Sequence, residues 1–206
     1  MDSQKQSHLP GKIQLPRRSS KERTRYYFLP SPPKKHPQPK SNHSWTTGQK
    51  QPLGFFDGAS QDLKCGGGAT LFLNPAHHFQ TATGLGSGSN NYAELMALKL
   101  LLCFAIERNC KKIQVFGDSL VVINWINKIQ KCRNTSLDAL FEEVSRLLAN
   151  FESLSLKHVY RERNMEADKL SKVGINLEWG TWKITETKET EANEFYHRPF
   201  LDFPRG

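Results

Sequence analysis

The chain has 206 residues, of which 37% are hydrophobic and 24% are charged, and this balance is enough for one domain with a hydrophobic core. No stretch approaches the ~20 apolar residues that a membrane-spanning helix needs, and the first residues lack the apolar segment of a secretory signal. The four cysteines form no pair with the two-residue spacing of zinc sites or redox motifs. We therefore expect an intracellular protein of the nucleus or cytoplasm, with reduced thiols and no membrane contact.

The excess of positive charge lies entirely in the first quarter of the sequence. Residues 1–50 hold 11 Lys+Arg against 2 Asp+Glu, whereas residues 51–206 hold 18 of each. The same quarter has 7 of the 11 prolines and few regularly spaced apolar residues, which predicts a disordered, basic, Pro-rich leader. Two interpretations stay open: a solubilising appendage left from upstream sequence, or a basic segment, including Arg17-Arg18 and Lys34-Lys35, that binds nucleic acid or directs the protein to the nucleus.

From residue 51 onward, apolar runs predict strands and helices. Three short runs separated by Gly66-Gly-Gly68 and Asn74-Pro75 predict an antiparallel meander. Helical apolar spacing and a further pair of strand-like runs follow, with Asn164 as the expected N-cap of the last helix. The predicted elements are strands at 53–56, 68–73 and 79–83, a helix at 93–110, a strand at 113–117, helices at 119–128 and 137–151, a strand at 154–160, and a helix after residue 164. This order predicts an α/β fold with a mixed five-stranded sheet, three strands antiparallel and then two parallel, and helices on both faces.

Four acidic residues occupy positions where side chains can converge in such a sheet. Asp57 and Asp118 each follow a predicted buried strand, and Glu94 and Asp168 lie near the starts of predicted helices. Carboxylates gathered in a partly desolvated site repel one another, and divalent cations relieve that repulsion. Because the set contains no Cys or His, it favours Mg²⁺ or Mn²⁺ over zinc. A single Asp after a strand is usually a turn residue or a helix cap, so the prediction depends on all four acids together.

The four acids are carried by four phrases: Phe56-Asp-Gly-Ala-Ser60, Asn90-Asn-Tyr-Ala-Glu-Leu-Met-Ala-Leu98, Gly117-Asp-Ser-Leu-Val-Val122 and His158-Val-Tyr-Arg-Glu-Arg-Asn-Met-Glu-Ala-Asp-Lys-Leu-Ser171. In this order they resemble a type 1 ribonuclease H domain of the variety carried by plant retrotransposons. The resemblance implies an endonuclease that hydrolyses the RNA strand of RNA–DNA hybrids with two Mg²⁺ ions, or Mn²⁺ in their place. It implies that Asp57 bridges both ions, that Glu94 and Asp118 complete one metal site, and that Asp168 completes the other. It also suggests a reverse transcriptase as a partner, and we expect a monomer.

The same resemblance implies contacts to the hybrid. Asn90 and Asn91 align with a pair that reads the minor groove, where the 2′-hydroxyls distinguish RNA, and we expect Ser89 and Gly58 to approach the nucleic-acid backbone. Ser89 and Asn90 are also candidates for capping a helix. Arg161 takes the position of the proton-shuttling His of many type 1 enzymes. With a pKa above ~12 it cannot shuttle protons at pH 7, but it could orient the scissile phosphate, so we expect it to contact nucleic acid.

Two further features depart from the best-known members of the resembled family, namely Leu120 and a short connection, and His158 does not take the place of the shuttling His. Leu120 stands where a Gln often reads the groove, and His158 falls within a predicted strand and is interpreted as structural. Only about eight residues, 129–136, join the two middle helices, too few for the extra helix and basic loop that some members use to hold the hybrid. Affinity is therefore expected to need help from the basic leader or from an attached protein.

The sequence divides into a leader at 1–50, a catalytic domain at 51–178 and a partly disordered C-terminal extension at 179–206. In the extension, Trp179, Trp182 and Ile184 are expected to pack on the domain, and the acidic run 186–194 is expected to be mobile. Two other functions stay open. One is a catalytically inactive, transposon-derived module that binds nucleic acid, and the other is a 3′–5′ exonuclease of a related fold. The exonuclease needs Asp-x-Glu on the first strand, where this chain has Asp57-Gly-Ala59.

Overall fold

The computed structural model describes residues 29–30 and 51–197. The predicted leader at 1–50 therefore lies outside the described residues, except for Leu29–Pro30, and so do the last nine residues of the predicted C-terminal extension. None of the described helices combines the length and the apolar character that a membrane span requires.

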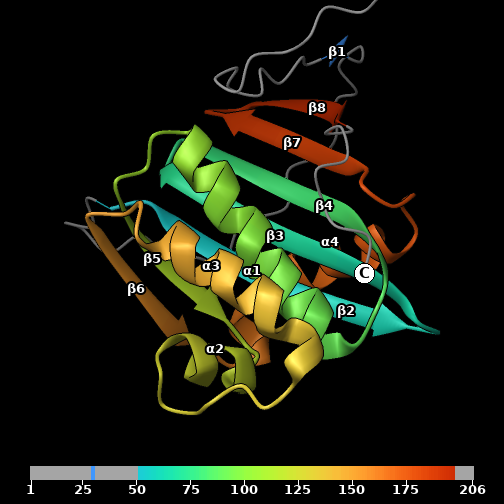
Figure 1. Cartoon of the computed structure of the whole chain (residues 1–206). Coiled ribbons are helices and arrows are strands. Elements are labelled where there is room, and N and C mark those ends of the chain that lie inside the picture. Colours follow the sequence, from blue (N-terminus) through green and yellow to red (C-terminus); the bar gives the residue numbers. More distant parts are fainter. Residues whose placement is uncertain (1–28, 31–50, 198–206) are drawn as a thin grey trace, which may run out of the picture.

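One mixed sheet forms the centre of the fold, and its strands lie in the order β1-β8-β7-β4-β3-β2-β5-β6 (Figure 1). The meander predicted from the three apolar runs is confirmed, since β2, β3 and β4 pair antiparallel, while β5 and β6 continue the sheet in parallel from β2. The strands are β1 (Leu29–Pro30), β2 (Leu53–Gln61), β3 (Lys64–Asn74), β4 (His77–Ser87), β5 (Lys112–Gly117), β6 (Ser153–His158), β7 (Trp182–Lys188) and β8 (Glu191–His197).

Helices cover both faces of this sheet. The long helix α1 lies on β2 and β3, and α3 packs against α1 on the same face, whereas α4 lies on β2, β3 and β4 from the opposite face (Figure 1). Every side chain of α1 from Ala93 to Leu98 is buried, because the helix is enclosed between the sheet and α3. The helices are α1 (Asn90–Glu107), α2 (Leu120–Ile126), α3 (Asp138–Leu148) and α4 (Met165–Ile175).

The predicted count of five strands is wrong, because the described residues form a sheet of eight strands. Beyond the expected five, β7 pairs antiparallel with β4, β8 pairs with β7, and the two-residue β1 pairs with β8. Trp182 and Ile184 are buried, as predicted, but the acidic run at 186–194 lies in the β7–β8 hairpin rather than in a mobile tail. Its charge suggested disorder, whereas alternate residues of β7 face the core and Lys183 forms an ion pair with Glu194 across the hairpin at 3.0 Å.

The role predicted for Gly66-Gly-Gly68 as a break between strands is also wrong. The three glycines lie inside β3, and the turn from β2 to β3 is made by Asp62 and Leu63, both with positive φ. A Cβ at Gly68 would collide with the backbone of α4 at Ala167 and Ser171. The glycines are therefore needed because α4 lies directly on the strand. This close packing also brings α4 into contact with Asp57 in β2.

Candidate active site

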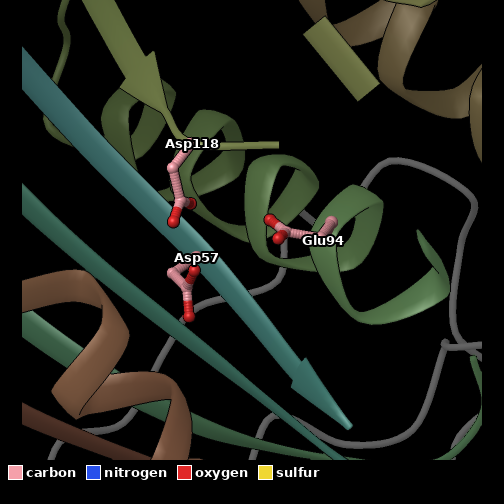
Figure 2. A group of neighbouring side chains, drawn as sticks. All are labelled: Asp57, Glu94 and Asp118. Atoms are coloured by element: carbon pink, nitrogen blue, oxygen red, sulfur yellow. The ribbon is translucent and has the colours of Figure 1, made fainter. Parts of the chain in front are cut away.

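Three of the four predicted acids meet at one point of the sheet. Asp57 lies in the middle of β2, Asp118 directly follows the neighbouring parallel strand β5, and Glu94 projects from the beginning of α1 (Figure 2). A carboxylate oxygen from each of these residues lies within 4.8 Å of one from each of the others. Phe56 in β2 pairs with Gly117 in the parallel strand β5, so the residues that follow them, Asp57 and Asp118, lie at equivalent positions on the two neighbouring strands. This explains why two residues so distant in sequence converge.

The position of Glu94 depends on Gly58. The backbone N–H of Gly58 donates a hydrogen bond to Oε2 of Glu94 at 3.1 Å. A Cβ at Gly58 would overlap the backbone of Ala93 and Glu94, so only glycine lets α1 approach β2 this closely. Gly58 was predicted to approach nucleic acid, but its described contacts are with α1, so its structural effect is to set the location of the Glu94 carboxylate.

Burial and mutual repulsion make the negative charges of the acid cluster unfavourable. Burial, together with the neighbouring charge of Asp118, raises the pKa of Asp57 to about 7 although Ser171 donates a hydrogen bond to it. Burial and the charges of Asp57 and Asp118 raise the pKa of Glu94 to about 9. Within the described part of the chain, none of these three acids forms an ion pair with Lys, Arg or His. Buried carboxyl groups with raised pKa values resist ionisation because burial disfavours their negative charges and these charges repel one another. A hard divalent cation prefers oxygen ligands and would remove this repulsion.

These raised pKa values predict how the stability of the metal-free protein depends on pH. Below about pH 4 the carboxyls of Asp57 and Glu94 are protonated in both the folded and the unfolded states, so they do not affect folding. Above that pH the unfolded chain releases their protons while the folded protein retains them up to about 7 and about 9, respectively. The contribution of these two carboxyls to the free energy of unfolding should therefore fall as the pH rises through this range and level off above about 9.

Between pH 7 and 8 Glu94 is the main source of this decline, because the buried thiols of Cys65, Cys103 and Cys110, whose pKa values are also raised, add to it only as the pH approaches their ordinary value of 9.0. The pKa values of His78 and His197 are lowered by burial, and these residues give the opposite slope, but only near pH 6 and below. Calorimetric melting with a chelator present should show a declining melting temperature between pH 7 and 8, and Glu94→Gln should remove most of the decline. A flat profile for the wild type in this interval would contradict the raised pKa of Glu94.

Asp168 lies near the cluster but is not part of it. It occupies the first turn of α4, and its carboxylate accepts hydrogen bonds from Arg161 and, at 2.6 Å, from Nζ of Lys172. Partial burial alone would raise the pKa of Asp168, but the bonds from these two cations outweigh it and hold the pKa below the usual value. The structure therefore brings together Asp57, Glu94 and Asp118, and places Asp168 beside them in an ion-pair network of its own.

The remaining predicted contact residues surround the acids. Ser89 caps α1 by accepting a hydrogen bond from the backbone N–H of Tyr92 at 3.2 Å, which confirms the capping interpretation. Asn90 is exposed and Asn91 is half-buried in the first turn of α1, one turn before Glu94. Arg161 begins a short 3-10 turn after β6, and 66% of its side chain is exposed. These residues are placed where a ligand at the acids could meet them, and their contact with nucleic acid stays a prediction.

Two polar residues at the site were not predicted to contact the acids. Asn164 directly precedes α4, as expected, but its side chain does not cap the helix. Its Nδ2 instead donates to the carbonyl oxygen of Phe56 at 2.9 Å and to Oδ1 of Asp118 at 3.0 Å. Ser171 is fully buried, and its hydroxyl contacts Oδ2 of Asp57. No local sequence signal distinguishes these contacts from capping or packing, because they depend on the approach of α4 to β2.

Comparison with known proteins identifies the family. A family model described as reverse transcriptase-like matches residues 55–174. Ribonuclease H1 from the halophilic archaeon Halobacterium salinarum is 26% identical with a TM-score of 0.57, and the match covers 61% of this chain and 98% of that one. The N-terminal ribonuclease H domain of a Mycobacterium tuberculosis protein is 23% identical with a TM-score of 0.56, covering 62% and 95%. LC11 ribonuclease H1 from compost, solved with an RNA/DNA hybrid, is 19% identical with a TM-score of 0.54, covering 61% and 97%.

These similarities agree with the mixed sheet, the helices on both faces and the acid cluster. The last two structures support the fold, and the first also supports the resemblance to a ribonuclease H domain, whereas the plant-retrotransposon variety stays a prediction. Since the family model spans more than half of the chain, this protein belongs to the reverse transcriptase-like family and has the ribonuclease H-like fold.

Proposed function

We propose that this protein hydrolyses the RNA strand of RNA–DNA hybrids endonucleolytically, with two Mg²⁺ ions as cofactors and Mn²⁺ as a substitute. The observation that supports this proposal most strongly is the convergence of Asp57, Glu94 and Asp118 within 4.8 Å on a ribonuclease H-like fold. The resemblance of the phrases around these acids to ribonuclease H domains of plant retrotransposons supports an origin in a mobile element, with a reverse transcriptase as a partner. We expect the monomer to be the active form.

Different residues of the chain would have different roles at this site. Asp57, Glu94 and Asp118 would hold one ion, with Asp57 shared with a second ion that Asp168 completes. Ions bound there would supply an activated water and neutralise the charge on the phosphate and the leaving oxygen. Arg161 and Lys172, which are 66% and 57% exposed, place two positive charges next to Asp168, where they can attract a phosphate. Arg161 stays protonated at pH 7, so it orients the substrate rather than transferring a proton.

Recognition of the RNA strand would come from the beginning of α1. Asn90 and Asn91 offer amide donors and acceptors beside Glu94, and the exposed Ser89 adds a hydroxyl. Such groups suit the 2′-hydroxyls that a hybrid presents in its wide minor groove, and they read them with little regard to base. His158 lies at the exposed end of β6 with its ring packed edge-on against Tyr160 at 5.7 Å, so we assign it no proton-transfer role.

The test is cleavage of an end-labelled hybrid by the full chain with Mg²⁺, compared with DNA duplex, RNA duplex and chelator controls. We expect internal cuts in the RNA strand at early times, only in the hybrid and only with a divalent ion. Products that shorten stepwise from the 3′ end would instead indicate an exonuclease. Binding of the hybrid without any cleavage would identify the inactive module and overturn the proposal.

The leader offers a separate prediction. Residues 1–28 hold 7 Lys+Arg against 2 Asp+Glu, and their removal leaves β1 in place. Phosphate contacts give a log–log salt dependence of roughly −0.9 per neutralised phosphate on a duplex. The truncated protein should therefore show a higher KM for the hybrid with a flatter salt dependence, at an unchanged kcat. A full-length variant with these seven cations replaced by Gln is the matched control and should behave like the truncation. Parallel salt slopes for all three proteins would show that the leader does not hold the substrate.

A further inference from the structure

The acids on the sheet are contacted by two uncharged donors from α4 and the residue before it. The Ser171 hydroxyl contacts Oδ2 of Asp57 and also lies 2.8 Å from the carbonyl oxygen of Asp168. The Asn164 amide nitrogen contacts Oδ1 of Asp118 at 3.0 Å. Ser171 is 0% exposed and Asn164 is 1% exposed. Two of the three clustered carboxylates therefore each have a buried donor that fixes one of their two oxygens.

The packing of α4 on β3 brings Ser171 to Asp57. Asp57 in β2 pairs with Gly68 in β3, and the space where a Gly68 Cβ would stand is filled by the backbone of α4 at Ala167 and Ser171. The absence of a side chain at Gly68 thus lets the helix lie directly behind Asp57. Because Ser171 has a single hydroxyl proton, it can donate to the ionised Asp57 or to the Asp168 carbonyl, but not to both at once.

Asn164 joins the two strands that carry the aspartates. Its Nδ2 donates both to Asp118, which follows β5, and to the Phe56 carbonyl oxygen, which belongs to the residue before Asp57 in β2. One amide therefore links the Asp118 carboxylate to the backbone next to Asp57. The Oδ1 of Asn164 is buried and has no hydrogen-bond partner among the described residues. A buried acceptor without a donor lowers stability, so packing alone does not explain an amide at this position.

We propose that Ser171 and Asn164 are positioning residues that align Asp57 and Asp118 for divalent-metal binding. The inference rests on the proposed function, and it adds two residues that hold ligands rather than touch the substrate. Carboxylates in a repelling cluster would otherwise rotate apart, and uncharged donors restrain them without neutralising the charge that attracts the cation. Partners of this kind commonly change metal affinity or activity by roughly 10- to 100-fold when they are removed.

The experiment compares Ser171→Ala and Asn164→Ala with the wild-type chain. Mn²⁺ and Mg²⁺ affinities are measured by calorimetric titration without substrate, and kcat and KM are measured with the hybrid. We expect each variant to bind the metals roughly 10- to 100-fold more weakly. At low metal concentration kcat should fall with little change in KM, and saturating metal should restore much of it. A residue that only supports packing would not give this recovery.

Two matched controls separate positioning from general loss of hydrogen bonds. Asn176→Ala removes an amide at the other end of α4 that donates to the Lys172 carbonyl oxygen at 3.2 Å. Thr81→Val removes a buried hydroxyl that donates to the Ala69 carbonyl oxygen at 3.4 Å. Neither contacts an acid of the cluster, so both variants should bind the metals like the wild type. If Ser171→Ala does not fold, Ser171→Cys keeps the size with a weaker donor and should show an intermediate loss of affinity.

The outcomes distinguish this inference from the proposed function. Wild-type affinity and activity in folded Ser171 and Asn164 variants, the Cys variant included, would overturn the positioning role and leave the proposed function intact. Equal losses in the two control variants would also overturn it, because the effect would then not be specific to the acids. A wild-type protein that neither binds the metals nor cleaves the hybrid would remove the proposed function, and the positioning role with it.

Discussion

Asp57→Asn is expected to reduce hybrid cleavage by roughly 10³-fold or more while leaving the protein folded. Asp57 is the acid that both ions of the proposed site would share, and metal stabilisation of a transition state contributes several kcal/mol, with about 1.4 kcal/mol per tenfold in rate. The same change should raise the melting temperature of the metal-free protein, because it removes one member of a buried cluster in which the pKa of Asp57 is raised to about 7. The measurements are single-turnover cleavage with Mg²⁺ and calorimetric melting with a chelator.

Asp138→Asn is the matched control for this variant. Asp138 is exposed in the first turn of α3 and is not a member of the acid cluster, so its replacement should change neither the cleavage rate nor the response to metal. The diagnostic result for Asp57→Asn is a loss of cleavage activity together with a gain in the stability of the metal-free protein. Near wild-type cleavage by this variant would show that the acid cluster is not the catalytic centre, whereas a fall in both activity and metal-free stability would indicate a structural role.

Gly58→Ala is expected to cause a large loss of stability. The added Cβ would overlap backbone atoms of Ala93 and Glu94, which cannot move without displacing α1 from the sheet. Overpacking against movable side chains costs typically 1–3 kcal/mol, and a collision with backbone should exceed the upper end, at more than ~3 kcal/mol. We expect a much lower denaturant midpoint, or insoluble protein, in parallel expression and urea-unfolding experiments.

Gly54→Ala in the same strand provides the comparison. A Cβ there would meet Cδ2 of Leu101 at 2.8 Å, and the end of a leucine side chain can rotate away. This variant should therefore lose far less stability than Gly58→Ala. If the two variants have the same denaturant midpoint, the close approach of α1 at Gly58 does not determine the stability of the fold. The location of Glu94 must then depend on other contacts.

The parts of the site that sequence can predict are those whose chemistry is local. Asp57, Glu94 and Asp118 stand in recognisable phrases at strand and helix positions, and all three meet in the structure. The ion pair of Asp168 with Arg161 was not predicted, because it depends on how α4 and the preceding turn pack together. The pair of Asp168 with Lys172 is an i,i+4 pair within α4, which the helical spacing alone could have indicated. Asn164 was interpreted from its place before a helix, where capping is the common role, whereas its contacts span 46 and 108 residues of sequence.

Errors in the predicted fold have the same origin. A run of glycines usually marks a turn, but Gly66-Gly-Gly68 lie inside β3 because two helices approach the strand from opposite faces. The β7–β8 hairpin was not predicted because its exposed face is rich in Glu and Lys, a composition that suggested a mobile segment. The apolar residues Trp182 and Ile184, which alternate with polar ones and are buried, indicate a strand instead. In both cases the deciding partner is distant in sequence.

The glycines of β3 also restrict which pairing of the first hairpin can lead to the native fold. Gly66 and Gly68 face α4, and a Cβ at either position would collide with the α4 backbone. A slip of one residue between β2 and β3 would put Gly67 in one of these two places and either Cys65 or Ala69 in the other, since neighbouring residues of a strand face opposite sides. The helix could then not dock, so hairpins formed in the wrong register would remain open and free to re-pair. Docking of α4 thus selects the correct register during folding.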